Sequence, residues 1–258
     1  MISPLAYIHP EAKIGENCEI GPFCVIEKDV VIGDNNTLMN SVTLLPGTRI
    51  GNGNRLFPGA VIGAIPQDLK FKGEYTTVEI GNNNTFRENV TVNRGTAAKG
   101  KTIVGSNNLL METVHIAHDA IVGNGCIIGN GTKLAGETVI DDFAILSANV
   151  LLHQFCRVGS YAMVGGGTRS AQSILPYSMT ARDPASFCGL NLVGLRRRGF
   201  TPEVIGQLHR AYQIIMGGGK LLENLEKVKE EIGMTPEITY ILDFINNVSN
   251  RGFIRTNK

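Results

Sequence analysis

A six-residue repeat of apolar side chains constrains the fold of this chain more than any other feature. Steps of six from Ile8 to Val164 give 27 positions, and only Asp68, Glu74 and Ala98 break the aliphatic pattern, apart from one aromatic residue at 86. Neither the 3.6-residue period of an α-helix nor the two-residue period of a strand produces this spacing. A triangular β-coil with six residues on each side does, because each side points one aliphatic residue inward. The sequence therefore predicts a parallel β-solenoid.

Two interruptions of the repeat mark the places where function is most expected. Residues 64–75 and 93–101 lose the pattern, yet the repeat resumes after each of them in the same register modulo six. Loops that leave a solenoid at a corner have their ends held still by the coils, which suits a binding site. The alternative is that both are plain solvated surface loops. We predict one solenoid domain over residues 1–190, with these two excursions.

The composition changes near the C-terminus to that of amphipathic helices. Thr201-Pro202-Glu203 has the hydroxyl cap, early proline and early carboxylate of a helix start, and this helix should end near the glycines at 217–219. Further helices are expected at 221–232 and from 236 to about 250. Because an open solenoid end exposes unpaired backbone, we predict that residues 191–258 form a small helical cap.

Charge and cysteine content restrict the setting in which the chain works. The formal net charge is +1, so nothing drives the whole chain toward nucleic acid or a membrane surface. The five cysteines are odd in number and form no CxxC pair, which is typical of free thiols in a reducing compartment. No apolar stretch approaches the length of a membrane span or a secretory signal. We predict a cytoplasmic protein without membrane insertion.

Three of the five histidines fall at positions that the solenoid should bring near one another. His118 is followed by Asp119, a carboxylate that could orient the ring for proton transfer near neutral pH. His153 follows almost two coils later, so it should lie about 10 Å away along one edge. With His115 they could instead bind zinc, as in some hexapeptide solenoids. The His-x-x-His spacing does not suit that site, and we predict no metal and no cofactor.

Several segments outside the repeat resemble one family closely. They are IPQDLKFKGE (65–74), RENVTVNRGT (87–96), NNLLMETVHIAHD (107–119), HQFCRVG (153–159) and NLVGLRRRGF (191–200). These segments are similar to the acyl-[acyl-carrier-protein]–UDP-N-acetylglucosamine O-acyltransferases, which catalyse the first step of lipid A biosynthesis. The resemblance covers essentially the whole chain. It implies a left-handed parallel β-helix, the winding of the families that carry this repeat.

The resemblance also implies a reaction and a set of catalytic residues. A long-chain (R)-3-hydroxyacyl group would pass from the carrier-protein thioester to the 3-hydroxyl of UDP-N-acetylglucosamine. His118 matches the general base, Asp119 the carboxylate that orients it, and the Gly136 amide the donor to the oxyanion. No acyl-enzyme is implied. The resemblance implies a homotrimer with active sites between neighbouring solenoids. The spacing from His118 to Gly166 is not a whole number of coils, so one chain should place these two residues on different sides.

Substrate contacts follow from the same residue-by-residue match. Residues that would contact the sugar nucleotide and the acyl hydroxyl are Gln67, Asp68, Lys70, His115, His153 and Gln154. Asn191, Arg197 and Arg198 would hold the nucleotide and its phosphates, a task that suits guanidinium, and exposed basic residues there could steer the acidic carrier protein. Gly166 matches the ruler of acyl length, and a glycine there implies an open groove and a long chain.

Three positions depart from the family pattern. Glu137 stands where better-known members have a substrate-contacting histidine, Val193 where they have a glutamate, and Asn93 where they have a histidine. The acceptor is therefore either UDP-N-acetylglucosamine or a 3-amino analogue that would give an amide. Two other classes stay open: a hexapeptide acyltransferase acting on an amine, and a scaffold without activity. Convergence of His118-Asp119 and Arg197-Arg198 on one cleft, within a chain or across a trimer, would favour the enzyme.

Overall fold

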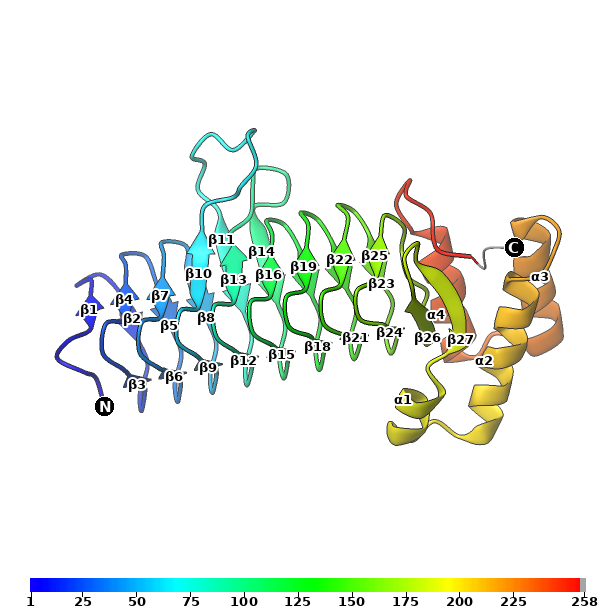
Figure 1. The fold of residues 1–258 in the computed structure, drawn as a ribbon, viewed down its shortest axis with the longest axis horizontal. Coiled ribbons are helices and arrows are strands. Elements are labelled where there is room, and N and C mark those ends of the chain that lie inside the picture. The colour runs from blue at the N-terminus through cyan, green and yellow to red at the C-terminus, as the bar shows by residue number, and fades with distance from the viewer. Residues whose placement is uncertain (256–258) are drawn as a thin grey trace.

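The computed structural model describes residues 1–255 as a three-sided parallel β-helix that ends in a helical region (Figure 1). One sheet has nine strands, in the order β1 (Tyr7–Ile8), β4 (Val25–Ile26), β7 (Thr43–Leu44), β10 (Val61–Ala64), β13 (Thr91–Asn93), β16 (His115–Ile116), β19 (Lys133–Leu134), β22 (Leu151–Leu152) and β25 (Arg169–Ser170). A second sheet has eight, β2 (Lys13–Ile14), β5 (Val31–Ile32), β8 (Thr48–Ile50), β11 (Thr77–Ile80), β14 (Lys101–Val104), β17 (Ile121–Val122), β20 (Val139–Ile140) and β23 (Arg157–Val158). The third has ten, β3 (Glu19–Ile20), β6 (Thr37–Leu38), β9 (Arg55–Leu56), β12 (Thr85–Phe86), β15 (Leu109–Leu110), β18 (Ile127–Ile128), β21 (Ile145–Leu146), β24 (Met163–Val164), β26 (Ser178–Ala181) and β27 (Ser186–Leu190).

The interior is made by the residues that the six-residue repeat selects. Ile26, Leu44, Ile62 and Phe86 are all fully buried, and the residue before each of them is only partly buried. Each buried aliphatic side chain contributes about 1.5–3 kcal/mol relative to exposure, so the stack as a whole holds the coils together. The prediction of a hexapeptide β-helix is confirmed.

The two excursions leave the helix without disturbing its register. In regular coils, equivalent corner residues such as Asn36 and Asn54 are 18 positions apart in the sequence. The separation rises to 30 between Asn54 and Asn84 and is 24 between Asn84 and Asn108, before it returns to 18 between Asn108 and Cys126. The first insertion therefore adds two sides of a coil and the second adds one side. Both excursions rise from the same edge of the helix, beside β10, β13 and β14 (Figure 1).

A buried column of asparagines fastens one corner of consecutive coils. The side-chain oxygen of Asn36 accepts the backbone N–H of Asn54 at 2.8 Å, Asn54 accepts that of Asn84 at 2.9 Å, and Asn84 accepts that of Asn108 at 2.9 Å. All four side chains are at most 2% exposed. Buried backbone donors at a corner need such partners, because an unsatisfied one costs about 1–3 kcal/mol. The hydrogen bonds of this column therefore stabilise the stack of coils in addition to the apolar core.

Replacing Asn84 by valine should lower the free energy of unfolding by about 3 kcal/mol, because the buried N–H of Asn108 and carbonyl of Gly105 lose their partners. Chemical denaturation followed by circular dichroism measures this difference. The matched control is Asn83→Gly, at an exposed corner residue whose φ of 56° glycine adopts freely. Equal stability of the two variants would contradict a structural role for the column.

The helical region covers the C-terminal end of the β-helix. It contains α1 (Leu192–Arg197), α2 (Pro202–Ile215), α3 (Leu221–Ile232) and α4 (Pro236–Asn246). Thr201 and Thr235 cap α2 and α4 through their side chains, each followed by proline. The predicted helix at 221–232 is confirmed, whereas the helix from 236 ends at Asn246, short of the expected end. The short helix α1 was not predicted, because so short a segment carries no apolar period.

Hydrogen bonds join the helical region to the last coils. The Tyr240 hydroxyl in α4 donates to Asp141 Oδ2 at 2.5 Å and accepts the backbone N–H of Ser160 at 2.9 Å. Burial raises the pKa of Asp141, and burial also raises the pKa of Tyr240 above the usual tyrosine range.

Since β27 ends at Leu190 and α1 begins at Leu192, we propose the domain boundary at 190/191 that the sequence suggested. Within residues 1–255, no helix is long and apolar enough to cross a membrane.

Candidate active site

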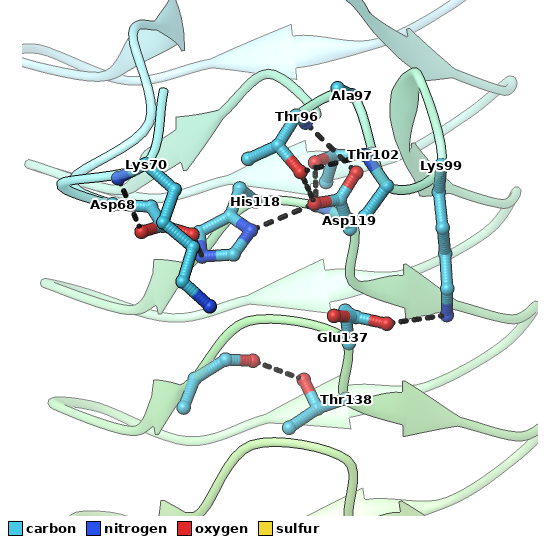
Figure 2. A network of polar contacts seen from close by, with 12 residues as sticks. Asp68, Lys70, Thr96, Ala97, Lys99, Thr102, His118, Asp119, Glu137 and Thr138 are labelled. Carbon is cyan, nitrogen blue, oxygen red and sulfur yellow. Dashed lines mark hydrogen bonds and ion pairs between the residues drawn. The ribbon is translucent and has the colours of Figure 1, made fainter. Parts of the chain in front are cut away.

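A histidine–aspartate pair lies at the corner that follows β16, beside residues of the two excursions (Figure 2). His118 Nδ1 is 2.8 Å from Asp119 Oδ2, and the side chains are 9% and 0% exposed. Since the carboxylate accepts this hydrogen bond, we assign the proton to Nδ1, which leaves a free lone pair on Nε2. Asp119 takes a left-handed backbone conformation, φ 59°, and its N–H donates to Thr102 Oγ1 at 2.8 Å. The corner itself thus turns the carboxylate toward the ring.

The Asp119 carboxylate is held from its other side by the second excursion. Thr96 donates its backbone N–H to Oδ1 at 2.9 Å and its hydroxyl to Oδ2 at 2.6 Å. Oδ2 therefore accepts from both Thr96 and His118 (Figure 2). A buried carboxylate needs donors of this kind, because leaving it unpaired in the interior is costly.

Gly136 lies against the imidazole ring of His118, one coil further along the β-helix. A Cβ at this position would lie 2.5 Å from Cε1 and 2.6 Å from Nε2 of His118, closer than any real contact. Glycine is required here because a side chain has no room, and not because of its backbone conformation, since φ lies outside the left-handed region. Among residues 1–255 the Gly136 N–H has no hydrogen-bond partner. An amide donor is thus free beside the imidazole.

The first excursion brings a second carboxylate to the ring. Asp68 Oδ2 lies 3.9 Å from His118 Nε2, and its Oδ1 accepts the Lys70 backbone N–H at 2.9 Å (Figure 2). Gln67 and Lys70 are exposed next to it. Glu74 Oε1 accepts the Ala97 N–H at 2.9 Å, so the two excursions are joined directly.

Two of the family departures have clear surroundings. Glu137 directly follows Gly136, at φ 58°, and its carboxylate lies 3.7 Å from the Lys99 ammonium of the second excursion. Asn93 is 3% exposed and its amide donates to the Ile65 carbonyl at 2.9 Å, which ties the base of one excursion to the other. Val193, the third departure, is exposed on α1.

His115 and His153 lie along the same sheet. His115 Nδ1 is 2.7 Å from Thr91 Oγ1, and burial, with a smaller contribution from Lys133, lowers its pKa. His153 and Gln154 follow β22, two coils from the corner of His118, and His153 borders an open groove with Leu151.

Within residues 1–255 no three His, Cys, Asp or Glu side chains are placed to hold a metal ion. Four of the five free thiols are buried, and burial raises the pKa of Cys126 to about 12.

The remaining predicted residues lie at other corners of the same chain. Arg198 stacks its guanidinium 4.3 Å from the centre of the Phe143 ring, which precedes β21, and Arg197 is exposed beside it. The Asn191 amide is engaged as the cap of α1, accepting the Gly194 N–H and donating to the Tyr161 carbonyl. Gly166 follows β24 in the ten-stranded sheet.

One chain therefore unites His118, Asp119, Gly136 and Asp68 but not the arginines or Gly166. Sequence reasoning missed Thr96, Thr102, Lys99 and Glu74. The available signals were the breaks in the repeat at 64–75 and 93–101, which located the loops that carry Glu74, Thr96 and Lys99 but not the side chains that matter in them.

Comparison with known proteins gives the same family along the whole chain. Residues 174–254 match the family described as UDP N-acetylglucosamine O-acyltransferase, domain 2, and residues 1–28, 29–64 and 101–136 match bacterial transferase hexapeptides. An acyl-[acyl-carrier-protein]–UDP-N-acetylglucosamine O-acyltransferase of Thermodesulfovibrio yellowstonii is 45% identical over 256 residues, 98% of this chain and 99% of that one.

Solved structures agree. A UDP-N-acetylglucosamine acyltransferase from Bacteroides fragilis is 64% identical with a TM-score of 0.97, covering 99% of this chain and 100% of that one. The enzyme from Francisella novicida is 41% identical with a TM-score of 0.97, covering 100% and 95%. The chain belongs to the family of acyl-[acyl-carrier-protein]–UDP-N-acetylglucosamine O-acyltransferases.

Proposed function

We propose that this chain transfers a long-chain (R)-3-hydroxyacyl group from acyl-carrier-protein to the 3-hydroxyl of UDP-N-acetylglucosamine, the first step of lipid A biosynthesis. The observation that carries the proposal is the buried His118–Asp119 pair, with the ring packed against Gly136, in a chain of this family. A scaffold without activity has no need of a buried carboxylate fixed by three donors behind one histidine.

The chemistry follows from the two nitrogens of the ring. Nε2 of His118 takes the proton of the sugar hydroxyl as its oxygen attacks the thioester carbonyl. The negative charge that develops on the carbonyl oxygen is stabilised by the N–H of Gly136. When the tetrahedral intermediate collapses, the carbon–sulfur bond breaks and the carrier thiolate takes the proton from the imidazolium. Asp119 orients the ring through Nδ1 and stabilises its cation.

The active enzyme is a homotrimer in this proposal, with each site shared by two chains. His118, Gly136 and Gln154 follow strands of the nine-stranded sheet, Gly166 follows a strand of the ten-stranded sheet, and Arg198 lies at a third corner. Corners on opposite sides of one solid β-helix cannot meet over one substrate. A neighbouring chain that presents its own face solves this, and closed symmetry is the common form of homo-oligomers.

We assign the substrate contacts of the sequence match to that shared cleft. Gln67, Asp68 and Lys70 would contact the sugar nucleotide from the first excursion, and His153 and Gln154 from two coils further on. His115 would contact the same cleft from its sheet, Glu137 would face the sugar, and Asn191, Arg197 and Arg198 would hold the nucleotide from the second chain. The exposed arginines would also attract the acidic carrier protein. The five unbridged cysteines support a cytoplasmic location.

The experiment is transfer of radiolabelled 3-hydroxyacyl groups from carrier protein to UDP-N-acetylglucosamine, with ester formation tested by mild alkali. Alkali-labile product is expected. An alkali-resistant product made only from the 3-amino sugar nucleotide would mean that the enzyme forms an amide and not an ester. The proposed acyl donor would be unchanged. A folded protein that transfers to neither acceptor would overturn the proposal.

Replacing Gly166 by methionine should shift the preferred acyl chain to a shorter one. A Cβ at 166 meets only the Ala148 carbonyl, at 3.3 Å, and the Ser147 side chain, at 3.9 Å, so a side chain can be built there and would project into the open surface beside β24. We expect the ratio of long-chain to short-chain transfer to fall about 100-fold, since each excluded methylene costs about 0.8 kcal/mol. The ratio is its own control, because loss of folded enzyme lowers both rates equally. An unchanged ratio would remove Gly166 from the acyl groove.

A further inference from the structure

We propose that Thr96 is a positioning residue for the reaction, which fixes the Asp119 carboxylate and through it the His118 ring. The inference rests on the proposed function and adds a residue from the second excursion to its machinery. Thr96 is 7% exposed, and it supplies two of the three donors to the side chain of Asp119.

The geometry distinguishes this contact from an ordinary loop hydrogen bond. The Thr96 N–H holds Oδ1 and its hydroxyl holds Oδ2, so one residue fixes the plane of the carboxylate. The Ala98 N–H donates to Thr96 Oγ1 at 3.2 Å, which uses the acceptor side of the hydroxyl and directs its proton to Asp119. The Oδ2 atom that receives this proton is the same atom that accepts from His118 Nδ1.

The energetic consequence concerns orientation more than stability. Asp119 is fully buried, so no water replaces a lost donor without rearrangement. With the hydroxyl removed, Oδ1 keeps only the Thr96 N–H and Oδ2 keeps only His118, so the carboxylate and the imidazole with it are held less rigidly. A catalytic base must hold its nitrogen within hydrogen-bond reach of the proton it takes, and small misplacements cost large factors in rate.

The second excursion is itself anchored, which makes Thr96 a rigid support. Arg94 and Gly95 donate their N–H groups to the carbonyls of Ala64 and Thr77 at 3.0 and 3.1 Å. Lys99 reaches Glu137 at 3.7 Å on the far side (Figure 2). The loop thus touches both the coil of His118 and the coil of Gly136, and Thr96 is its contact with the catalytic carboxylate.

The test compares Thr96→Val, which has the same shape without the hydroxyl, with Thr96→Ser, which keeps it. We expect Thr96→Val to lower kcat by about 10- to 100-fold with KM for UDP-N-acetylglucosamine changed by less than about threefold, and Thr96→Ser to restore most of kcat. Lys101→Met is the matched control, since it removes the exposed Lys101–Glu79 ion pair at the end of the second excursion without touching Asp119 or Glu137. It should keep kcat within about threefold.

A second readout does not depend on activity. In protein labelled with ¹⁵N-histidine, the wild type should show His118 with a proton on Nδ1, and Thr96→Val should shift or broaden that signal while Lys101→Met leaves it unchanged. Failure of the wild type to transfer acyl groups would overturn the proposed function, and the spectra would still test the role of Thr96. An unaltered His118 signal with unaltered kcat in Thr96→Val overturns the inference, as does an equal loss of kcat in Lys101→Met.

Discussion

His118→Ala should lower kcat for acyl transfer by roughly 10³-fold, within the 10²–10⁴ range typical of a lost general base. The sugar hydroxyl is a poor nucleophile until its proton is removed, and among residues 1–255 no other imidazole lies at the corner where Asp119 and Gly136 meet. Substrate contacts from the excursions remain, so KM for UDP-N-acetylglucosamine should change much less than kcat. Initial rates at saturating acyl-carrier-protein measure the effect.

Two further variants make this result specific. His118→Gln keeps the size of the side chain and a donor to Asp119 but has no basic nitrogen, so it should be as inactive as alanine. His209→Ala, at an exposed position on α2, should have wild-type activity. Circular dichroism and the unfolding midpoint verify that each variant is folded. More than a tenth of wild-type kcat in His118→Gln would exclude His118 as the base.

The fold could be predicted well because the period of the repeat determines the geometry of each coil. A six-residue period fixes which residue of each side points inward, and Leu44, Ile62 and Val92 are buried as that period requires. The multiples of six in the insertions followed from the same rule. The helix boundaries at Thr201 and Thr235 could be predicted because capping is a local property of a few residues.

The candidate site was predictable only in part. His118 and Asp119 are neighbours in the sequence, so their pairing needs no knowledge of the fold, whereas Gly136 came from the family resemblance. Thr96 and Lys99 lie in an excursion that no period describes, and their partners Asp119 and Glu137 belong to later coils of the chain. Such contacts depend on loop conformation, which local propensity does not specify. Gly166 and Arg198 lie at other corners than His118, so their place in the proposed cleft depends on a second chain and comes from the family resemblance.

Gly136→Ala should lower kcat by about 100-fold while the protein keeps its fold. The new methyl group would lie 2.5 Å from His118 Cε1, so the ring must leave its position against the backbone and its hydrogen bond with Asp119 must lengthen or break. The backbone itself accepts alanine, because φ at 136 is outside the left-handed region. Steady-state rates with both substrates varied measure the loss, and Gly206→Ala, where a Cβ meets open space, is the control.

Combining the change with His118→Ala identifies why Gly136 is a glycine. If its small size serves only to seat the imidazole, the double variant should be as active as His118→Ala alone, within about threefold, because the ring that clashes is gone. We expect this result, since alanine keeps the N–H proposed to bind the oxyanion. A further tenfold loss in the double variant would instead mean that the methyl group also displaces the amide or the substrate. The same cycle therefore separates the space that Gly136 leaves for the base from the donor that it offers to the transition state.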